Sequence, residues 1–483
     1  MSTERQPLEP LRSSRRVRFL ADRQLDELRA ATLRILEEVG VKFTSERALA
    51  VFEEHGASVD RRTQVVRLAP DLVLRAMATV PRYPTLAARD PSRDLVLQEG
   101  VTWFTNDGCG MEVMDVETGE VRPSTLADVA DMARVGDYLP SIGFVWPIVS
   151  ATDHGRTSPL HELGAIWNAT TKHVQSETIM GGAHCRYALE MGTVLAGSRE
   201  GLRRRPNFSL VVCTIAPLLQ DQEGIEGAMV VAEAGIPVVF LAMPTFGTTA
   251  PATAAGALVM GDAEIISATV LLQLLNPGTP VFHSLMQAWA DPRTGGYVSY
   301  PLDQRVRYAP VEMAHHWGMP ALGACYGTDS IRPGTWQSAA EVALDPFWAG
   351  LVGPEIVTGM GLVKTYTRLY PESIILDDDL YQRARYALLD LEVSPETLAL
   401  DVIANVGPAG HFLAEEHTRR HMRDGFVRGL THQLGPDRAY RDPIEVARER
   451  VRTILDTHHP EPLADAQRAE LARILAAADR ELG

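Results

Sequence analysis

The sequence predicts an α/β protein built on a closed barrel of eight parallel strands, with helical segments before and after it. From about residue 100, short β-branched and apolar runs alternate with longer helical stretches, which is typical of parallel strands joined by right-handed crossovers. Eight such units fit within residues 99–375, and a (β/α)8 TIM barrel takes about 250 residues. No glycine-rich dinucleotide-binding loop follows a strand, which disfavours the alternative, an open doubly wound sheet.

The chain before the barrel is expected to be α-rich. Residues 1–18 mix Arg with Pro and Glu and lack the apolar core of a signal peptide, so we expect a frayed N-terminus there. Residues 19–98 form the N-terminal α-rich segment. Apolar side chains at helical spacing predict a helix over 22–39, ended by Gly40. A second helix is expected to start after Thr44-Ser45, a possible N-cap, and to run to His55, with Gly56 ending it.

The barrel region, 99–375, is predicted from its apolar runs and the periodic stretches between them. The expected strands are 100–105, 143–149, 173–179, 208–214, 237–242, 280–285, 320–325 and 355–360. The expected helices are 125–138, 159–171, 185–197, 221–234, 251–275, 302–317 and 337–351.

Residues 376–483 are predicted to form a C-terminal helical layer packed on the barrel. Pro and Gly separate its helical pieces, which is how helices are usually ended. These pieces are 377–391, 394–405, 411–423 and 443–480, the last broken near Pro460.

The composition excludes several classes of partner. The 483 residues carry a net charge of −16, which argues against binding to nucleic acid or anionic membranes. Four Cys are too few for a disulfide scaffold and indicate a reducing compartment. No apolar run reaches the roughly 18–20 residues of a membrane span. We therefore expect a cytoplasmic homo-oligomer that binds neither nucleic acid nor membranes.

Candidate substrate-binding residues lie at the predicted carboxyl ends of the strands, where barrels of this kind carry their chemistry. Aromatic rings clustered there would hold a quaternary ammonium through cation–π attraction, worth about 0.5–2 kcal/mol per ring, with ordinary rim packing as the alternative. The predicted substrate-binding residues are Trp103, Phe104, Asn106, Trp146, Phe246, His283, Tyr326 and Arg332. Further strand-end candidates are Asp107, His154, Met243 and Gln287.

Carboxyl and thiol groups at strand ends supply candidates for catalysis and metal binding. Glu177 and Asp329 are the candidate catalytic residues. Glu177, Cys213 and Cys325, with His283 nearby in strand order, would make a zinc site with one open position. The alternative is that both Cys are small buried apolar residues.

A histidine cluster follows in the C-terminal segment. His417 and His421 are four residues apart on a predicted helix, close after His411. Such a pair can bind a metal, but no third ligand is evident from the sequence, which favours a surface or interface role.

Long stretches of the chain, from about residue 20 to 425, resemble the trimethylamine methyltransferase family. They are ILEEVGVKF (35–43), VMDVETGEVRPSTLADVADMARVGDYLPSI (113–142), AGIPVVFLAMPTFGTTAPATAAGALVMGDAEIISATVLLQLLNPGTPVF (234–282), DPRTGG (291–296) and LEVSPETLALDVIANVGPAGHFLAEEHTRRHMR (391–423). The loop after the seventh strand reads CYGTDSIRPGTWQSA (325–339), with neither pyrrolysine nor Lys. The chain therefore resembles the non-pyrrolysine branch, which includes glycine betaine methyltransferases.

This resemblance implies a (β/α)8 fold and methyl transfer from a quaternary or tertiary amine, betaine-like in this branch, to Co(I) of a corrinoid. The corrinoid is expected on a cognate partner protein, because this chain has no Asp-x-His-x-x-Gly stretch. Arg332 would hold a betaine carboxylate.

Some residues depart from the family pattern. Glu177, Cys213, His283 and Cys325 stand where the family usually has small or neutral residues. Two alternatives stay open: a zinc-dependent methyltransferase for an alcohol, ether or thiol, and a non-catalytic quaternary-amine binding protein.

Overall fold

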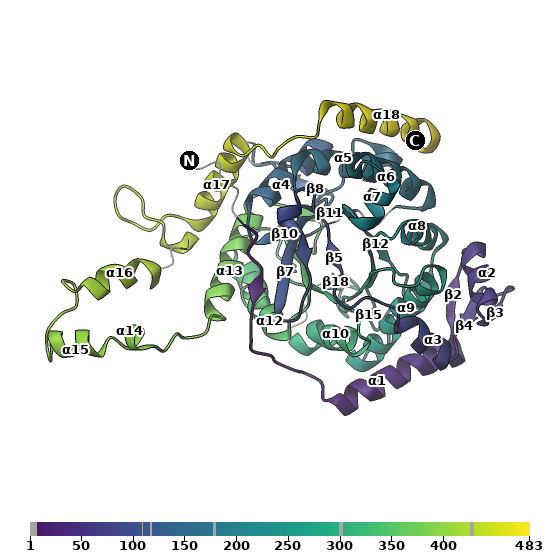
Figure 1. Ribbon diagram of the computed structural model, residues 1–483, viewed down its shortest axis with the longest axis horizontal. Helices are drawn as coiled ribbons and strands as arrows, with labels where there is room; N and C mark the ends of the chain where they lie inside the picture. The colour runs from purple at the N-terminus through teal and green to yellow at the C-terminus, as the bar shows by residue number, and fades with distance from the viewer. Residues whose placement is uncertain (1–6, 109, 116–117, 177–179, 299–302, 426–428) are drawn as a thin grey trace.

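The computed structural model describes residues 7–108, 110–115, 118–176, 180–298, 303–425 and 429–483. Eight parallel strands form a barrel in the order in which they occur along the chain (Figure 1). A parallel bridge between His283 and Ala321 joins the sixth and seventh strands and completes the circle. The strands are β7 (Val101–Asn106), β10 (Ile142–Val145), β11 (His173–Gln175), β12 (Phe208–Cys213), β14 (Val238–Ala242), β16 (Val281–Leu285), β19 (Leu322–Ala324) and β20 (Ile356–Met360). The predicted barrel is confirmed, and each of the eight predicted strands has an observed counterpart. The last three residues predicted for the third strand, 177–179, lie outside the described residues.

Helices alternate with these strands and cover the outside of the barrel (Figure 1). The expected helix 337–351 is two helices, because the chain turns at Leu344 and a second helix begins at Asp345, with Pro346 in its first turn. The helices are α4 (Leu126–Tyr138), α5 (Ser158–Ala169), α6 (Gly182–Ala196), α7 (Arg199–Arg204), α8 (Gln222–Glu233), α9 (Ala254–Leu275), α10 (Gln304–His316), α11 (Trp336–Val342), α12 (Asp345–Val352) and α13 (Ser373–Ala387).

Side chains of the strands alternate between two cores. Trp103, Phe144 and Phe282 belong to a cluster inside the barrel, whereas their neighbours along each strand join the large core between strands and helices. A hairpin of β5 (Thr85–Leu86) and β6 (Leu95–Val96) adds leucines to the inner cluster. It lies at the amino-terminal end of the barrel, since Leu95 reaches Gly143 near the beginning of β10. The opposite end is left for the site.

The N-terminal segment contains strands that the sequence analysis missed. Its helices are α1 (Asp22–Arg34), continued by a π-helical turn at Ile35–Val39, α2 (Glu46–Glu54) and α3 (Pro70–Met77). Between them β2 (Val41–Phe43), β3 (Ser58–Asp60) and β4 (Val65–Arg67) form a small sheet with β13 (Leu219–Gln220). Each of these strands has two or three residues, too few to show an apolar period.

The expectation of a frayed end over 1–18 is corrected for its described part. β1 (Leu11–Arg12) pairs antiparallel with barrel strand β7, and Leu11 is buried. A short segment thus gains order by pairing with the first residues of β7, Val101 and Thr102, a contact that the sequence alone does not reveal.

Among the described residues, one helix, α9, is long and apolar enough in composition to cross a membrane, but most of its apolar stretch is buried inside the protein. Two of its carboxyl groups are buried with partners. Asp262 accepts hydrogen bonds from Thr32 and Trp317, and Glu264 accepts hydrogen bonds from Thr214 and the backbone of Leu218.

The C-terminal helices divide into two groups. α13, α17 (Pro443–Thr457) and α18 (Asp465–Leu482) form the predicted helical layer, with α17 against α4 and α13, and α18 against α6. Between α13 and α17 the chain instead leaves the barrel, at the left of Figure 1. This extension carries α14 (Pro395–Leu398), α15 (Leu400–Val406) and α16 (Glu416–Gly425).

The buried carboxylate of Asp137, on α4, ties distant segments to the barrel. It accepts hydrogen bonds from Arg93 at 3.0 Å, the backbone N–H of Thr171 at 2.8 Å and His458 at 2.9 Å. Burial by itself would raise the pKa of Asp137, but the His458 hydrogen bond and the charges of Lys172 and Arg93 hold it well below its ordinary value. The carboxylate therefore stabilises the fold as an anion.

We expect Asp137→Asn to lower the free energy of unfolding by about 3–5 kcal/mol, because it leaves Arg93 buried and uncompensated. Urea denaturation at pH 7 measures this. The difference in unfolding free energy between the wild type and the variant should become smaller as the pH falls below about 4. A carboxyl group with a depressed pKa stabilises the fold only while it is ionised. Asp131→Asn on the same helix, where the side chain is 50% exposed, is the control and should change little. Equal effects would show that Asp137 has no special role.

Candidate functional site

A cavity of about 150 Å³ lies at the carboxyl ends of the barrel strands. Its volume is similar to that of an engineered cavity of roughly 150 Å³ that admits benzene, so it suits a ligand of about that size. Its wall is mostly apolar, with a few polar groups. The lining residues are Asp107, Gly108, Trp146, Cys213, Leu241, Met243, Leu285, Met286, Gln287, Tyr297, Arg307, Ala324, Cys325, Thr358, Gly359 and Tyr366.

Trp146 is fixed in this wall through its backbone. The Asn106 side chain accepts the Trp146 backbone N–H at 3.0 Å and donates to the Trp146 carbonyl at 2.5 Å. The indole lies against Gly108, where a Cβ atom would meet the ring at 2.6 Å. The indole Nε1–H is buried and has no hydrogen-bond partner among the described residues. The cavity wall therefore contains both an aromatic ring and a buried donor without a partner among the described residues.

The positive charge of the described wall comes from Arg307 on α10. Arg307 is buried and forms an ion pair with Asp345, the first residue of α12. Asp345 also accepts the backbone N–H of Tyr326 at 3.0 Å. Burial raises the pKa of Asp345 to about 6 despite this pairing, so the group is mostly ionised at pH 7. Asp107, Arg307 and Asp345 together leave the site with about one negative charge, which favours a ligand that carries a cation.

Close backbone contacts shape the side of the cavity formed by β19 and β20. Gly359 has φ +131°, and a Cβ atom there would lie 1.9 Å from the Cys325 carbonyl oxygen. A Cβ atom on Gly327 would lie 2.0 Å from the Tyr366 hydroxyl. Both positions admit Tyr366 and the β19 loop to the wall only because they carry no side chain.

A small sheet covers part of the mouth. It joins β15 (Thr245–Phe246), β17 (Ala288–Ala290) and β18 (Tyr297–Val298), which belong to the loops after the fifth and sixth barrel strands. Phe246 packs on Trp289 with ring centroids 4.3 Å apart. The sheet thereby brings Tyr297 to the cavity wall.

Some sequence-predicted residues meet in this cavity. Trp146 and Cys213 line it, together with the strand-end candidates Asp107, Met243 and Gln287. Cys325 contributes to the wall as well, but its thiol is buried in the outer core, with Sγ 3.5 Å from the Tyr308 hydroxyl.

Three of the predicted substrate-binding residues lie on the first barrel strand, β7, and none of them lines the cavity. Trp103 lies deeper in the barrel, in the inner cluster with Leu95. Phe104 faces outward and packs on Tyr381, with ring centroids 5.0 Å apart. Asn106 serves as the clamp on Trp146 and is a positioning residue.

His283 and Tyr326 also point outward from the barrel and do not lie at its mouth. His283 lies in the outer layer, 2.9 Å from Asp262 of α9. Tyr326 packs against Phe104 in the outer core. His154 lies away from the cavity, stacked on His161 beside the C-terminal helix α18.

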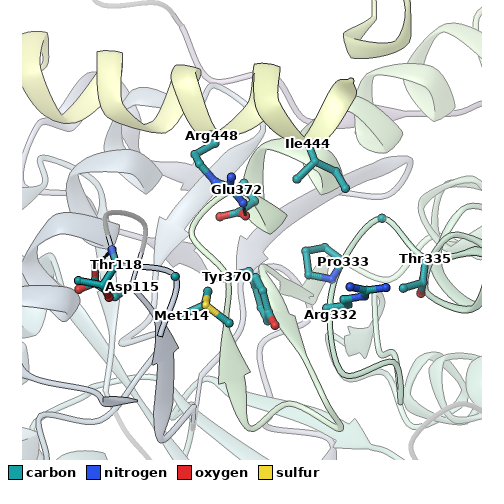
Figure 2. Close-up of a pocket in the computed structure, with 12 residues that line it drawn as sticks. Met114, Asp115, Thr118, Arg332, Pro333, Thr335, Tyr370, Glu372, Ile444 and Arg448 are labelled. Atoms are coloured by element: carbon teal, nitrogen blue, oxygen red, sulfur yellow. Dashed lines mark hydrogen bonds and ion pairs between the residues drawn. The ribbon is translucent and has the colours of Figure 1, made fainter. Parts of the chain in front are cut away.

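The remaining candidates occupy loops. Asp329 accepts a hydrogen bond from Thr365 at 3.0 Å and does not line the cavity. Figure 2 shows Arg332 beside Pro333 and Thr335, in a second cleft of about 830 Å³ and not in the cavity at the mouth. Glu177 lies outside the described residues.

Of the predicted zinc ligands, the structure places Cys213 and Cys325, and their thiols do not come together. Cys213 packs with the inner cluster, whereas Cys325 packs with the outer core, so their side chains leave the barrel wall on opposite sides. Burial also raises the pKa of the Cys325 thiol well above its ordinary value.

The one group of three metal-type ligands found among the described residues is Glu396, His417 and His421, with ligand atoms within 4.8 Å of one another. Arg420 already lies 3.1 Å from the Glu396 carboxylate, and His417 contacts the Glu396 carbonyl at 3.2 Å. We interpret the group as contacts that join α14 to α16.

Sequence reasoning missed Tyr297, Arg307 and Tyr366. Tyr297 and Tyr366 lie beyond the strand ends, in loops whose path has no periodic signal. Arg307 lies on helix α10, where no local pattern distinguishes it from Arg305 two residues earlier.

We expect Gly108→Ala to displace the Trp146 indole, because the new Cβ atom would lie 2.6 Å from the ring. Calorimetric titration with glycine betaine, from the ligand class that the resemblance implies, should show affinity at least about ten-fold weaker. Gly164→Ala in α5, whose added Cβ meets only ordinary contacts at 3.4 Å, is the control. Unchanged affinity in Gly108→Ala would remove Trp146 from the binding wall.

Comparison with known proteins agrees with this architecture. The model of the family described as trimethylamine methyltransferase (MTTB) matches residues 2–483. The trimethylamine methyltransferase MttB of Desulfitobacterium hafniense (strain DSM 10664 / DCB-2) is 32% identical over 469 residues, 96% of this chain and 94% of the relative. The glycine betaine methyltransferase of D. hafniense (strain Y51) is 26% identical over 475 residues, 96% of this chain and 98% of that protein.

Solved structures support the fold. The monomethylamine methyltransferase MtmB of Methanosarcina barkeri superposes with a TM-score of 0.52 at 11% identity, covering 91% of this chain and 88% of MtmB. The hydroxylamine complex of MtmB gives a TM-score of 0.54, also at 11% identity, over 92% and 89% of the two chains. The family match over nearly the whole chain, the identity to MttB and the shared barrel establish that this chain is a methyltransferase of the trimethylamine methyltransferase family.

Proposed function

We propose that this chain transfers a methyl group from a small betaine, a quaternary ammonium that bears a carboxylate, to a corrinoid on a separate protein. The observation that carries the proposal is the make-up of the cavity at the barrel mouth. Aromatic side chains and Asp107 line it beside Arg307 and the unpartnered indole N–H of Trp146. The aromatic side chains and Asp107 suit a methylated cation. Arg307 and the indole N–H suit a carboxylate.

A quaternary donor agrees with the make-up of the described lining residues, none of which is Lys or His. When a C–N bond of a quaternary ammonium breaks heterolytically, the amine leaves neutral and needs no proton. The chain's task is then to hold the cation against the aromatic faces, orient one methyl group outward and exclude water.

The corrinoid is best placed on a partner. A cavity of about 150 Å³ accommodates a small amine, not a corrinoid macrocycle, so the corrinoid would approach the mouth from outside. A corrinoid in the Co(I) state supplies the nucleophile that accepts the methyl group. Glycine betaine is our first candidate donor because it combines both charged groups in a small molecule, and one relative bears its name.

Methyl transfer from a panel of amines to cob(I)alamin tests the donor. We expect glycine betaine to give dimethylglycine and methylcobalamin, with trimethylamine a poorer donor. Transfer from trimethylamine and from none of the quaternary amines would overturn the proposal. Binding of glycine betaine with no transfer, even with a corrinoid protein encoded beside this chain, would instead favour the non-catalytic alternative.

We expect Trp146→Phe to raise KM for glycine betaine by about ten-fold, because the ring remains while the buried donor to the carboxylate is lost. Choline, a quaternary ammonium without a carboxylate, serves as the matched substrate, and its kcat/KM should change much less. Equal losses for both substrates would show that the indole N–H does not recognise the carboxylate.

The zinc-dependent alternative for an alcohol, ether or thiol donor predicts loss of activity on removing either thiol. We expect Cys213→Ala to retain methyl transfer within about three-fold, since the two thiols lie on opposite sides of the barrel wall. Activity is measured with glycine betaine, and metal content is measured in protein purified without chelators. Stoichiometric zinc that disappears in Cys213→Ala together with activity would revive this alternative.

A further inference from the structure

We propose that the extension between α13 and α17 is an exchange arm that packs on a second copy of this chain. We call residues 389–422 the arm. The structure describes all of them, and none is buried. The arm leaves the body after buried Leu388 and the chain returns at buried Leu430. Figure 1 shows it projecting from the barrel on one side.

The arm exposes apolar surface at the upper end of the range found on monomeric proteins, although it has no buried residue of its own. Nine large apolar side chains of the arm are 44–86% exposed. Together they present roughly 500 Å² of apolar surface, at about 100 Å² for a fully exposed aliphatic side chain. Monomeric proteins seldom expose a continuous apolar patch beyond about 300–600 Å². The nine are Leu389, Leu391, Val393, Leu398, Leu400, Ile403, Phe412, Leu413 and Met422.

The arm has no apolar core of its own, and the contacts within it do not compensate for that lack. α14 and α15 have no buried residue, and the contacts between α14 and α16 are polar ones through Glu396, His421 and Arg420. Exposed ion pairs and hydrogen bonds of this kind contribute little stability. A surface outside the arm must cover its apolar side chains.

The body of the same chain offers a matching surface at the root of the arm. A groove of about 430 Å³, which we call the root groove, is lined by apolar residues that include Ala339, Val342 and Leu430, together with charged side chains such as Asp379 and Arg383. Close by along the chain, Ile331, Trp336 and Leu344 are 64%, 88% and 61% exposed. The same chain therefore has an uncovered apolar arm and an uncovered apolar face beside the arm's root.

A second copy of the chain would cover both the apolar arm and the apolar face beside its root, because the same contact would form twice. If a two-fold axis passes beside the root, each arm crosses to the root groove of the other copy, which gives an isologous interface. Two arms and the faces that cover them would bury on the order of 2,000 Å², the range of permanent dimers. A corrinoid protein is a poorer occupant, since it must dock and leave in every turnover and transient interfaces are less apolar.

Light scattering on the purified full chain tests the inference, with no substrate present, so the result is independent of the proposed donor. We expect a mass twice the 52.9 kDa of the chain. An arm variant, Leu391→Glu with Leu413→Glu, and a body variant, Trp336→Glu, should each raise the dimer dissociation constant at least about 100-fold. The control Val96→Glu, at a site 57% exposed on β6, should remain dimeric. Circular dichroism verifies that every variant is folded.

Mixing the two defective variants distinguishes arm-to-body exchange from packing of arm on arm. A mixed dimer regains one intact contact, between the unaltered arm of the body variant and the unaltered groove of the arm variant. We therefore expect the mixture to form dimers at concentrations where each variant alone is monomeric. A monomeric wild type, or a mixture with no recovery, would overturn the proposal. So would variants that stay dimeric and lose only transfer to the corrinoid protein.

Discussion

The buried ion pair between Arg307 and Asp345 is the interaction on which the site depends. It places a cation in the wall of the cavity and a carboxylate directly behind it, in a region where neither would be stable alone. Asp345 also holds the backbone of the β19 loop through Tyr326, so the pair connects α10, α12 and the mouth of the barrel. Because this ion pair is nearly neutral overall, Asp107 sets the sign of the net charge of the cavity. That charge accounts for the preference for a cation.

Around this pair, the shape of the cavity is decided by backbone more than by side chains. Asn106 fixes Trp146 by both of its main-chain polar groups, and Gly108 leaves room for the indole. Gly359 allows the Cys325 carbonyl to come close. Such contacts are rigid because they join neighbouring strands of a closed sheet, and rigidity is what positioning a methyl group requires.

The body and the arm differ in how they are stabilised. The barrel buries two layers of apolar side chains and anchors its C-terminal helices through Asp137, while the arm buries none of its own. A chain with both parts has most of its stability in the monomer and keeps one segment whose conformation depends on an external surface. The apolar composition of that segment suits a lasting association.

The sequence by itself determined the barrel, its eight strands and most of its helices, because the alternation of apolar runs and amphipathic stretches is a local property of the chain. It also placed Trp146, Cys213 and Asp107 at the mouth. It did not determine which way each strand side chain points. Barrel strands are buried on both faces, so they show no polar alternation from which to infer orientation. Tertiary structure alone turned Phe104 and His283 outward, separated Cys213 from Cys325, and brought Tyr297, Arg307 and Tyr366 to the cavity from loops and a helix.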